Sequence, residues 1–218
     1  MEKEAFNSLV KSIRCDFVKG SLMENEVDAD PLKQFSVWLD QAFRNGNSLA
    51  NAMTLSTVDT EGMPSSRVML LRDVSSGGFT FFTNYHSKKG KDLTKNNKAS
   101  ILFFWPELER QVRVQGLVSL LPEKESEDYF RSRPFESQVG AWVSQQSEVV
   151  EDRAEMDRVY ERLSLMYKDR QVPKPPHWGG LVLVPLVIEF WQGRAGRLHD
   201  RLQYRSDGGV WVMERLMP

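Results

Sequence analysis

The chain has 218 residues, a formal net charge of −1 and a hydrophobic content of 40%. This length fits one globular domain, and the near-zero charge gives no overall field that would draw the protein to nucleic acid or an anionic membrane. Cys15 is the only cysteine, so the sequence excludes an intrachain disulfide and a cysteine-based metal site and fits the reducing cytoplasm. Residues 1–10 lack a long apolar run, and no stretch reaches the roughly 18 apolar residues of a membrane span, so we expect neither a signal peptide nor a membrane anchor.

The N-terminal half predicts two helices followed by short strands. Residues 1–20 are expected to form a helix or a mobile arm. Asp30 and Pro31 mark the start of a second helix, because a capping aspartate followed by proline is typical of a helix N-terminus, and Gly46 marks its end. Short runs of strand-forming residues between turn signals then predict antiparallel strands at 53–58, 66–71 and 79–83.

The C-terminal half predicts longer strands among amphipathic helices. Ser87 is expected to cap a short basic helix that ends at Asn96. The same reasoning predicts strands at 99–105, 111–121 and 180–191, helices at 122–131 and 151–167, and a hairpin formed by 201–204 and 210–215. Six or more antiparallel strands with peripheral helices indicate a mainly β protein, a small closed or split barrel, with residues 1–218 as a single domain.

No glycine-rich phosphate loop of the G-x-G-x-x-G or G-x-x-x-x-G-K-[ST] type occurs, so side chains must hold any bound nucleotide phosphate. The densest candidate segment is 188–201, where an apolar strand ends in a loop with Arg197, His199 and Arg201 at alternating positions. If residues 197–201 are extended, the three side chains share one face. Two guanidiniums and an imidazole on one face would repel one another unless an anion lies nearby. The alternative is a solvated strand end in which His199 pairs with an acid, and the pattern alone leaves both interpretations open.

This segment resembles, at every defined position, the signature of the pyridoxamine 5′-phosphate oxidase family. The pattern is an apolar residue, Glu, an aromatic residue, Trp, Gln, four free positions, then Arg, an apolar residue, His, Asp and Arg. Other segments resemble the family in the same order, namely 67–72, 82–84, 87–89, 109–113, 129–134, 137–138, 140–142 and 144–147. The resemblance extends from about residue 14 to the end of the chain. It implies an antiparallel split β-barrel that binds FMN and carries flanking α-helices.

The resemblance also implies a set of cofactor-binding residues. Arg67, Lys88 and Lys89 would hold the FMN phosphate, which suits the doubly charged group and the fork of an arginine, with Ser87 at a helix start adding backbone donors. Without the resemblance, the two lysines would suit a solvated helix face as well. The full implied set is Arg67, Val68, Met69, Leu70, Leu71, Arg72, Phe82, Thr83, Ser87, Lys88, Lys89, Gln111, Gln146, Ser147, Trp191 and Arg201.

A second implied set binds the substrate. Tyr129 and Arg133 are four residues apart and would share one face of a helix, although an ordinary amphipathic helix has the same spacing. Arg197 and His199 are implied as the catalytic residues beside the reacting carbon C4′, with His199 orienting the substrate or handling a proton. The full implied set is Arg14, Phe17, Arg72, Tyr129, Arg133, Ser137, Arg197, Leu198 and His199.

Several positions depart from the family pattern, including residues 49–51, where the family often has an acidic residue and a proline before Ala52. Phe17 stands where the family usually has a tyrosine that covers the active site, and Phe82 stands where a tyrosine is common. Arg72 replaces a frequent lysine, which keeps the charge but changes its geometry. Cys15 is expected to be a small core or lid residue, and no metal site is expected at His86 or His177.

The resemblance implies an FMN-dependent oxidase that converts pyridoxine and pyridoxamine 5′-phosphates to pyridoxal 5′-phosphate, uses O2 and releases H2O2. It also implies a homodimer with shared active sites, in which Arg72 and Arg133 come from one chain and Arg197 and His199 from the other. Two other functions stay open: a flavin reductase that uses a nicotinamide on a related barrel, and a flavin- or pyridoxal-phosphate-binding protein without turnover. Release of peroxide distinguishes all three.

Overall fold

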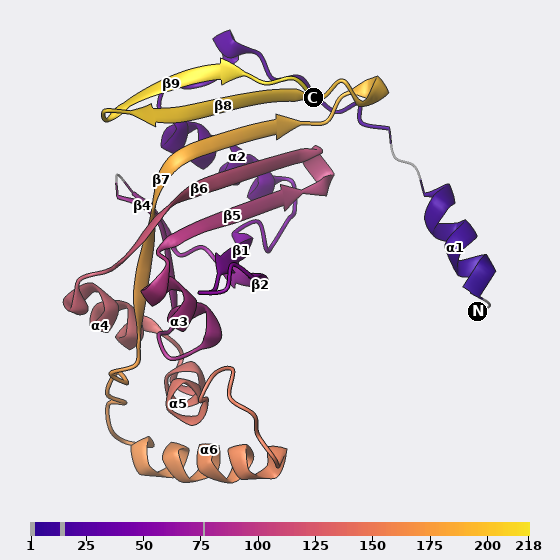
Figure 1. The fold of residues 1–218 in the computed structure, drawn as a ribbon. Coiled ribbons are helices and arrows are strands. Elements are labelled where there is room, and N and C mark those ends of the chain that lie inside the picture. The colour runs from indigo at the N-terminus through magenta and orange to yellow at the C-terminus, as the bar shows by residue number, and fades with distance from the viewer. Residues whose placement is uncertain (1–2, 14–15, 76) are drawn as a thin grey trace. The chain divides into compact units, whose positions relative to one another are not determined.

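The computed structural model describes residues 3–13, 16–75 and 77–218 (Figure 1). The chain divides into two compact units. One unit comprises Met1–Ala50, Phe104–Val112 and Ile188–Pro218, and the other comprises Asn51–Phe103 and Arg113–Val187. We call them the terminal unit and the central unit. Since compact units can belong to one domain or to two, the single domain at 1–218 stays a prediction.

The central unit is built on an antiparallel sheet. Its strand order is β2-β1-β5-β6-β7-β4-β3, an open path in the described residues, so the sheet is split rather than closed. Strands β5, β6 and β7 continue into the terminal unit. The strands are β1 (Ala52–Val58), β2 (Pro64–Leu70), β3 (Asp73–Ser75), β4 (Gly78–Asn84), β5 (Lys98–Trp105), β6 (Arg110–Leu120) and β7 (Trp178–Gln192).

Alternation of side chains gives strand β1 an inner and an outer face. Met53, Leu55 and Thr57 are buried, whereas the residues between them are half-buried, as the two-residue period of a strand requires. Strand β2 pairs with β1 in antiparallel register, from Ala52 opposite Leu70 to Val58 opposite Pro64. The predicted turn joins them, and Gly62 adopts a φ of +84° that favours glycine.

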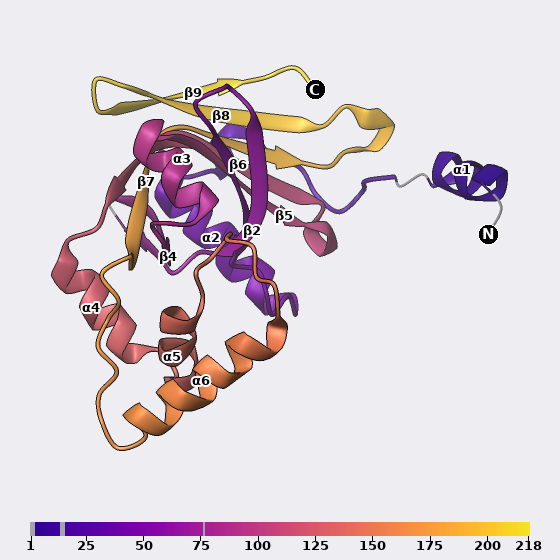
Figure 2. The same cartoon turned by 60° about the horizontal axis from the view of Figure 1, so that its bottom comes forward.

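Helices α3 (Lys88–Lys95), α4 (Glu123–Ser132), α5 (Phe135–Val143) and α6 (Arg153–Tyr167) also belong to the central unit, and α5 lies beside α6 (Figures 1 and 2). The Ser87 hydroxyl accepts a hydrogen bond from the Gly90 amide, which confirms the predicted cap of α3. Phe130, Val139, Val172 and Trp178 form a hydrophobic cluster at α4 and α5. Neither α5 nor the short strand β3 was predicted from the sequence.

The terminal unit has its own aromatic core. It contains α1 (Lys3–Ser12), η1 (Glu24–Glu26), α2 (Pro31–Arg44), η2 (Pro106–Leu108), η3 (Ala195–Arg197), β8 (Asp200–Asp207) and β9 (Val210–Arg215). Trp38 meets Phe190 edge to face at 5.1 Å between ring centroids, and Phe190 meets Tyr204 in the same way at 5.6 Å. Asp30 accepts a hydrogen bond from the Leu32 amide, which confirms the predicted start of α2.

The loop before β8 does not have the extended form considered for residues 197–201. A short 3-10 turn occupies Ala195–Arg197, with φ values of +64° at Gly196 and +61° at Arg197, and the strand begins only at Asp200. Arg197, His199 and Arg201 therefore do not share the face of one strand. None of the described helices has the length and apolar character needed to cross a membrane.

Candidate active site

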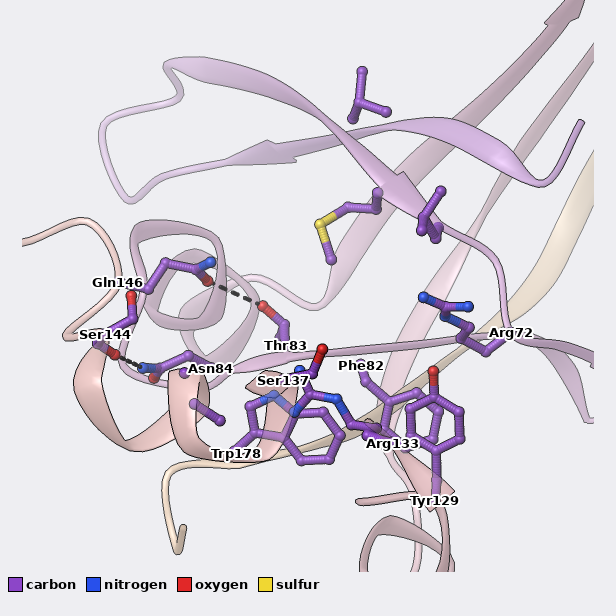
Figure 3. A pocket seen from close by; sticks show the side chains of 15 residues that line it. Arg72, Phe82, Thr83, Asn84, Tyr129, Arg133, Ser137, Ser144, Gln146 and Trp178 are labelled. Carbon is purple, nitrogen blue, oxygen red and sulfur yellow. Dashed lines mark hydrogen bonds between the residues drawn. The ribbon is translucent and has the colours of Figure 1, made fainter. Parts of the chain in front are cut away.

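A cavity of about 460 Å³ lies in the central unit (Figure 3). Seven of the residues predicted to bind the cofactor line it: Val68, Met69, Leu70, Arg72, Phe82, Thr83 and Gln146. Tyr129, Arg133 and Ser137, which were predicted to bind substrate, line the same cavity. Residues from two implied binding sets, far apart in the sequence, thus meet around one space large enough for a small ligand.

Arg67 on β2 is held by neutral oxygens of the β1–β2 hairpin. One guanidinium nitrogen, Nη1, donates to the Thr57 hydroxyl at 2.8 Å and to the Leu55 carbonyl at 3.3 Å. The other, Nη2, donates to the Ser65 hydroxyl at 2.8 Å. Burial lowers the pKa of Arg67, and the nearby Asp92 carboxylate opposes that shift.

Lys89 is the second cation, and its side chain is only 7% exposed. Its ammonium donates to Oε1 of Gln146 at 2.7 Å, to the Thr83 hydroxyl at 3.2 Å and to the Ser87 hydroxyl at 3.3 Å. Burial, followed by repulsion from Arg67, lowers the pKa of Lys89 from 10.5 to about 8. A bound anion would favour the charged forms of both Lys89 and Arg67.

The start of α3 supplies further donors beside this pair. The Lys88 amide donates to the Ser147 hydroxyl at 3.2 Å, and Ser147 has a φ of +78°. The Lys88 ammonium lies 3.4 Å from Asp59 and 3.5 Å from Asp92, with half of its side chain exposed. The structure therefore brings Arg67 and Lys88 close to Asp92 and places Lys89 near Arg67, in an arrangement suited to an anion.

Three stacked rings form one wall of the cavity. Phe82 stacks on Tyr129 at 3.8 Å and on Trp178 at 5.4 Å between ring centroids. The Arg133 guanidinium lies over the Trp178 ring at 4.6 Å, and Arg72 lies 5.9 Å from the Tyr129 ring (Figure 3). Phe82 thus lacks a tyrosine hydroxyl but keeps the stacking face.

Arg133 has hydrogen-bonding capacity to spare. Its Nη1 is buried and has no hydrogen-bond partner within the described residues. Burial lowers the pKa of the guanidinium, and the neighbouring Arg72 lowers it further. An anion in the cavity would satisfy both the unpaired donor and the repulsion between the two guanidiniums.

Sequence reasoning missed several residues of this site. Asn84, Gly140, Ala141 and Ser144 line the cavity and lie within segments that resemble the family, so those segments were the available signal. Trp178 had no such signal, because a tryptophan at a strand start is most often a core residue. Its contact with Arg133 depends on how β7 packs against α4.

Apart from Leu71, the remaining predicted residues that the structure describes lie in the terminal unit. His199 accepts a hydrogen bond at Nδ1 from the Arg194 amide, at 3.1 Å, and its ring lies 4.7 Å from Trp191 and 5.5 Å from Phe17. Arg197 and Leu198 are exposed, and Gln111 is half-buried on β6. His199 is therefore oriented by a backbone amide and two rings. The alternative from the sequence, in which His199 pairs with an acidic side chain, does not describe these contacts.

Arg201 makes a two-pronged ion pair with the buried Glu189. Its Nε and Nη2 donate to the two carboxylate oxygens at 3.0 and 3.1 Å, which fixes the plane of the guanidinium. Leu71 is buried next to the cavity-lining residues of β2. The predictions for Arg14 and Cys15 lie outside the described residues.

Comparisons with known proteins decide the family. A family model described as "Pyridoxamine 5'-phosphate oxidase" matches residues 39–167, and one described as "Pyridoxine 5'-phosphate oxidase C-terminal dimerisation region" matches residues 178–218. The chain belongs to the pyridoxamine 5′-phosphate oxidase family. A relative from Nostoc punctiforme is 50% identical over 210 residues, which is 96% of this chain and 98% of the relative. Another, from Neisseria gonorrhoeae, is 50% identical over 207 residues, which is 95% and 98%.

Both relatives are named pyridoxine/pyridoxamine 5′-phosphate oxidase. Among solved structures, PhzG from Burkholderia lata in complex with tetrahydrophenazine-1-carboxylic acid matches with a TM-score of 0.86 and 29% identity, over 90% of this chain and 98% of that chain. An FMN-binding protein from Nostoc punctiforme, related to pyridoxamine 5′-phosphate oxidase, matches with a TM-score of 0.71 and 17% identity, over 88% and 100%, and shows the fold alone. The predicted family, the split antiparallel fold and the assignment as an oxidoreductase are confirmed.

The environment of Lys89 generates a prediction that needs no cofactor. In the flavin-free protein, the Lys89 ammonium should titrate near pH 8, and added inorganic phosphate should raise this pKa because an anion favours the charged form. NMR of ¹³C-methylated lysines measures the titration, and the Lys89→Gln variant identifies the signal. A pKa that phosphate does not move would contradict anion binding at this position.

Proposed function

We propose that the chain is an FMN-dependent oxidase that converts pyridoxine 5′-phosphate and pyridoxamine 5′-phosphate to pyridoxal 5′-phosphate. O2 is the acceptor and H2O2 is released; when the amine is the substrate, one water is consumed and ammonia also leaves. One observation carries this proposal: the same cavity is lined by seven of the predicted flavin residues, Arg72 among them, and by Tyr129, Arg133 and Ser137. Two relatives also support the proposal. They share half of their residues with this chain over nearly its whole length, and both are named pyridoxine/pyridoxamine 5′-phosphate oxidase.

The residues around Arg67 fit the phosphate of FMN. In the described part of the chain, the hydrogen bonds of Arg67 and Lys89 go to neutral oxygens, so both charges are available to a ligand. A phosphate of about −2 charge would balance them, and the positive end of the α3 dipole would add to its binding. A clamp made of side chains, without a dinucleotide glycine loop, favours FMN over a dinucleotide flavin.

The rest of the proposed cofactor site would hold the flavin ring. Gln111, Gln146 and Ser147 offer neutral hydrogen-bonding groups for a ring edge that has both donors and acceptors. Trp191 offers a ring face, and the ion pair with Glu189 fixes the guanidinium of Arg201.

Arg133 and Arg72 are proposed to bind the phosphate of the substrate. Two guanidiniums face the cavity beside the hydroxyl groups of Tyr129 and Ser137, and Nη1 of Arg133 lacks a partner among the described residues. A phosphate monoester would accept hydrogen bonds from all four side chains. An uncharged substrate would leave the cations unpaired.

Arg197 and His199 are proposed to act at the substrate ring. When bound, FMN would accept the hydride from C4′. Since Nδ1 of His199 accepts a backbone hydrogen bond, the neutral ring carries its proton on Nε2 and can donate it to a substrate oxygen. Arg197 is exposed in the loop before β8 and would stabilise negative charge that develops on the substrate. Phe17 lies against His199 and would cover the ring without a phenol hydroxyl.

A homodimer is supported by the family description of residues 178–218 as a dimerisation region. We propose further that each active site draws on two chains, with Arg72 and Arg133 from one and Arg197 and His199 from the other. The single cysteine fits our proposal that the enzyme works in the cytoplasm.

The activity is tested by supplying pyridoxine 5′-phosphate and O2 to the flavin-loaded protein. We expect stoichiometric pyridoxal 5′-phosphate and H2O2, measured by absorbance and by a peroxidase-coupled assay. A nicotinamide-dependent flavin reductase would instead consume NADH or NADPH, and a binding protein would release no peroxide. Either outcome, with FMN bound, would contradict the proposed oxidase.

Arg133→Ala tests the substrate-phosphate site. We expect KM for pyridoxine 5′-phosphate to rise about tenfold or more, the scale of a lost hydrogen bond to a charged group, while the FMN content stays unchanged. Arg131→Ala is the matched control, because Arg131 lies in the last turn of α4 and is exposed beside Glu127, whereas Arg133 follows the end of that helix in an extended conformation, outside the helix face predicted for it. Equal turnover of unphosphorylated pyridoxine by the wild type would overturn the phosphate assignment.

Complementation tests the shared site. Arg133→Ala and Arg197→Ala are unfolded, mixed and refolded together, and activity is measured at a substrate concentration well below KM, where each variant alone has little activity. Random pairing makes about half of the dimers mixed, and each of these has one site free of both changes, so activity should return to roughly a quarter of the wild type. No recovery, with subunit mixing verified by mass spectrometry, would show that both residues serve a site within one chain.

A further inference from the structure

Thr57 occupies a position where the fold alone would favour valine. It follows Met53 and Leu55 on the inner face of β1, and its side chain is 0% exposed. A hydroxyl buried at such a position costs free energy unless its hydrogen bonds are made. Its partners are therefore the reason to look for a role beyond packing.

The Thr57 hydroxyl connects two charged groups. It accepts a hydrogen bond from Nη1 of Arg67 and donates one to Oδ2 of Asp92, both at 2.8 Å. Since a hydroxyl has one proton, donating it to the carboxylate directs the oxygen lone pairs at the guanidinium. Asp92 on α3 is itself 6% exposed, so the hydrogen bond between Thr57 and Asp92 is shielded from solvent.

The register of the hairpin explains why Thr57 meets Arg67. Leu55 lies opposite Arg67 and Thr57 lies opposite Ser65, so all four side chains share one face of the β1–β2 pair. The guanidinium spans Ser65 and Thr57 and is held at both ends. Ser56 and Ser66 form a similar hydroxyl pair at 2.8 Å on the opposite face.

We propose that Thr57 and Asp92 are positioning residues that orient the Arg67 guanidinium toward the phosphate of FMN. This inference rests on the proposed function and assigns to that site two residues that the family resemblance did not supply. Asp92 places a negative charge beside a site for an anion, which by electrostatics alone opposes phosphate binding. Its contribution is instead to hold the Thr57 proton, so that Arg67 keeps one orientation before the ligand arrives.

Affinity for FMN and for riboflavin separates positioning from general folding effects, because riboflavin lacks the phosphate. In the full-length chain freed of flavin, Thr57→Val should raise the Kd for FMN about tenfold and leave the Kd for riboflavin within about twofold. Quenching of flavin fluorescence measures both constants, and thermal melting checks the fold. Thr57→Ser should restore FMN affinity, and Ser56→Ala, the control on the opposite face, should change neither constant.

For Asp92→Ala, a purely electrostatic role and a positioning role predict opposite changes in FMN affinity. If Asp92 acts only as a nearby charge, its removal tightens FMN binding, and the proposal is overturned for this residue. If it positions Thr57, FMN binding weakens although a repulsive charge has gone. In the Arg67→Ala background, Thr57→Val should add nothing further, since the two residues act through one group.

The outcomes show separately whether the positioning role of Thr57 fails or whether the proposed FMN site itself fails. A wild-type chain that binds riboflavin and FMN equally, or neither, contradicts the proposed cofactor site itself. A wild type that prefers FMN, with Thr57→Val unchanged or weakened equally toward both flavins, overturns the positioning role alone.

Discussion

Two neighbouring cations, the half-buried Arg67 and the buried Lys89, set the requirement that the rest of the central unit satisfies. Burial lowers the pKa of each side chain, and repulsion from Arg67 contributes to the lowered pKa of Lys89. A protein that keeps such a pair loses stability unless an anion compensates them when it is bound. The hydroxyl and amide oxygens around them hold the cations in place without neutralising them, which leaves their charge for a ligand.

The same reasoning applies to Arg133, which lines the cavity, with different chemistry. Arg133 is supported by the face of Trp178, which has no hydrogen-bond acceptor to give. A guanidinium on an aromatic face keeps its N–H groups free, and one of them is unpaired among the described residues. The central unit thus contains two cationic sites, one supported by hydroxyl groups and one by rings.

Local signals made much of the fold predictable. Asp30 before Pro31 and Ser87 before a basic segment are caps whose mechanism lies within a few residues, and both helices begin where the sequence indicates. Strand β3 and helix α5 were missed, because a three-residue strand has too few residues to show a period. Helix α5 begins directly after Pro134, which reads equally well as the end of the preceding helix.

The candidate site was predictable only where a motif carried it. The signature around Arg197 and His199 identified the family, but its supposed extended form was wrong, since positive φ values at Gly196 and Arg197 turn the chain there. The partnership of Thr57 with Asp92 has no signal in the sequence, because the two residues lie on different elements and meet only when α3 packs near the hairpin. Motifs report which groups touch a ligand, and the fold determines what holds those groups.

The contacts that hold each side chain also explain the departures from the family pattern. Phe82 has lost a hydroxyl but stacks on Tyr129 and Trp178, and Phe17 has lost one but packs edge-on against His199. Arg72 keeps the charge of the lysine that it replaces. In each case the property retained is the one that the surrounding contacts use, a ring face or a positive charge. The hydroxyls that the structure does place in hydrogen-bonded chains, on Thr57 and Ser87, are those that hold a cation, and for these a ring or an alkyl group is no substitute.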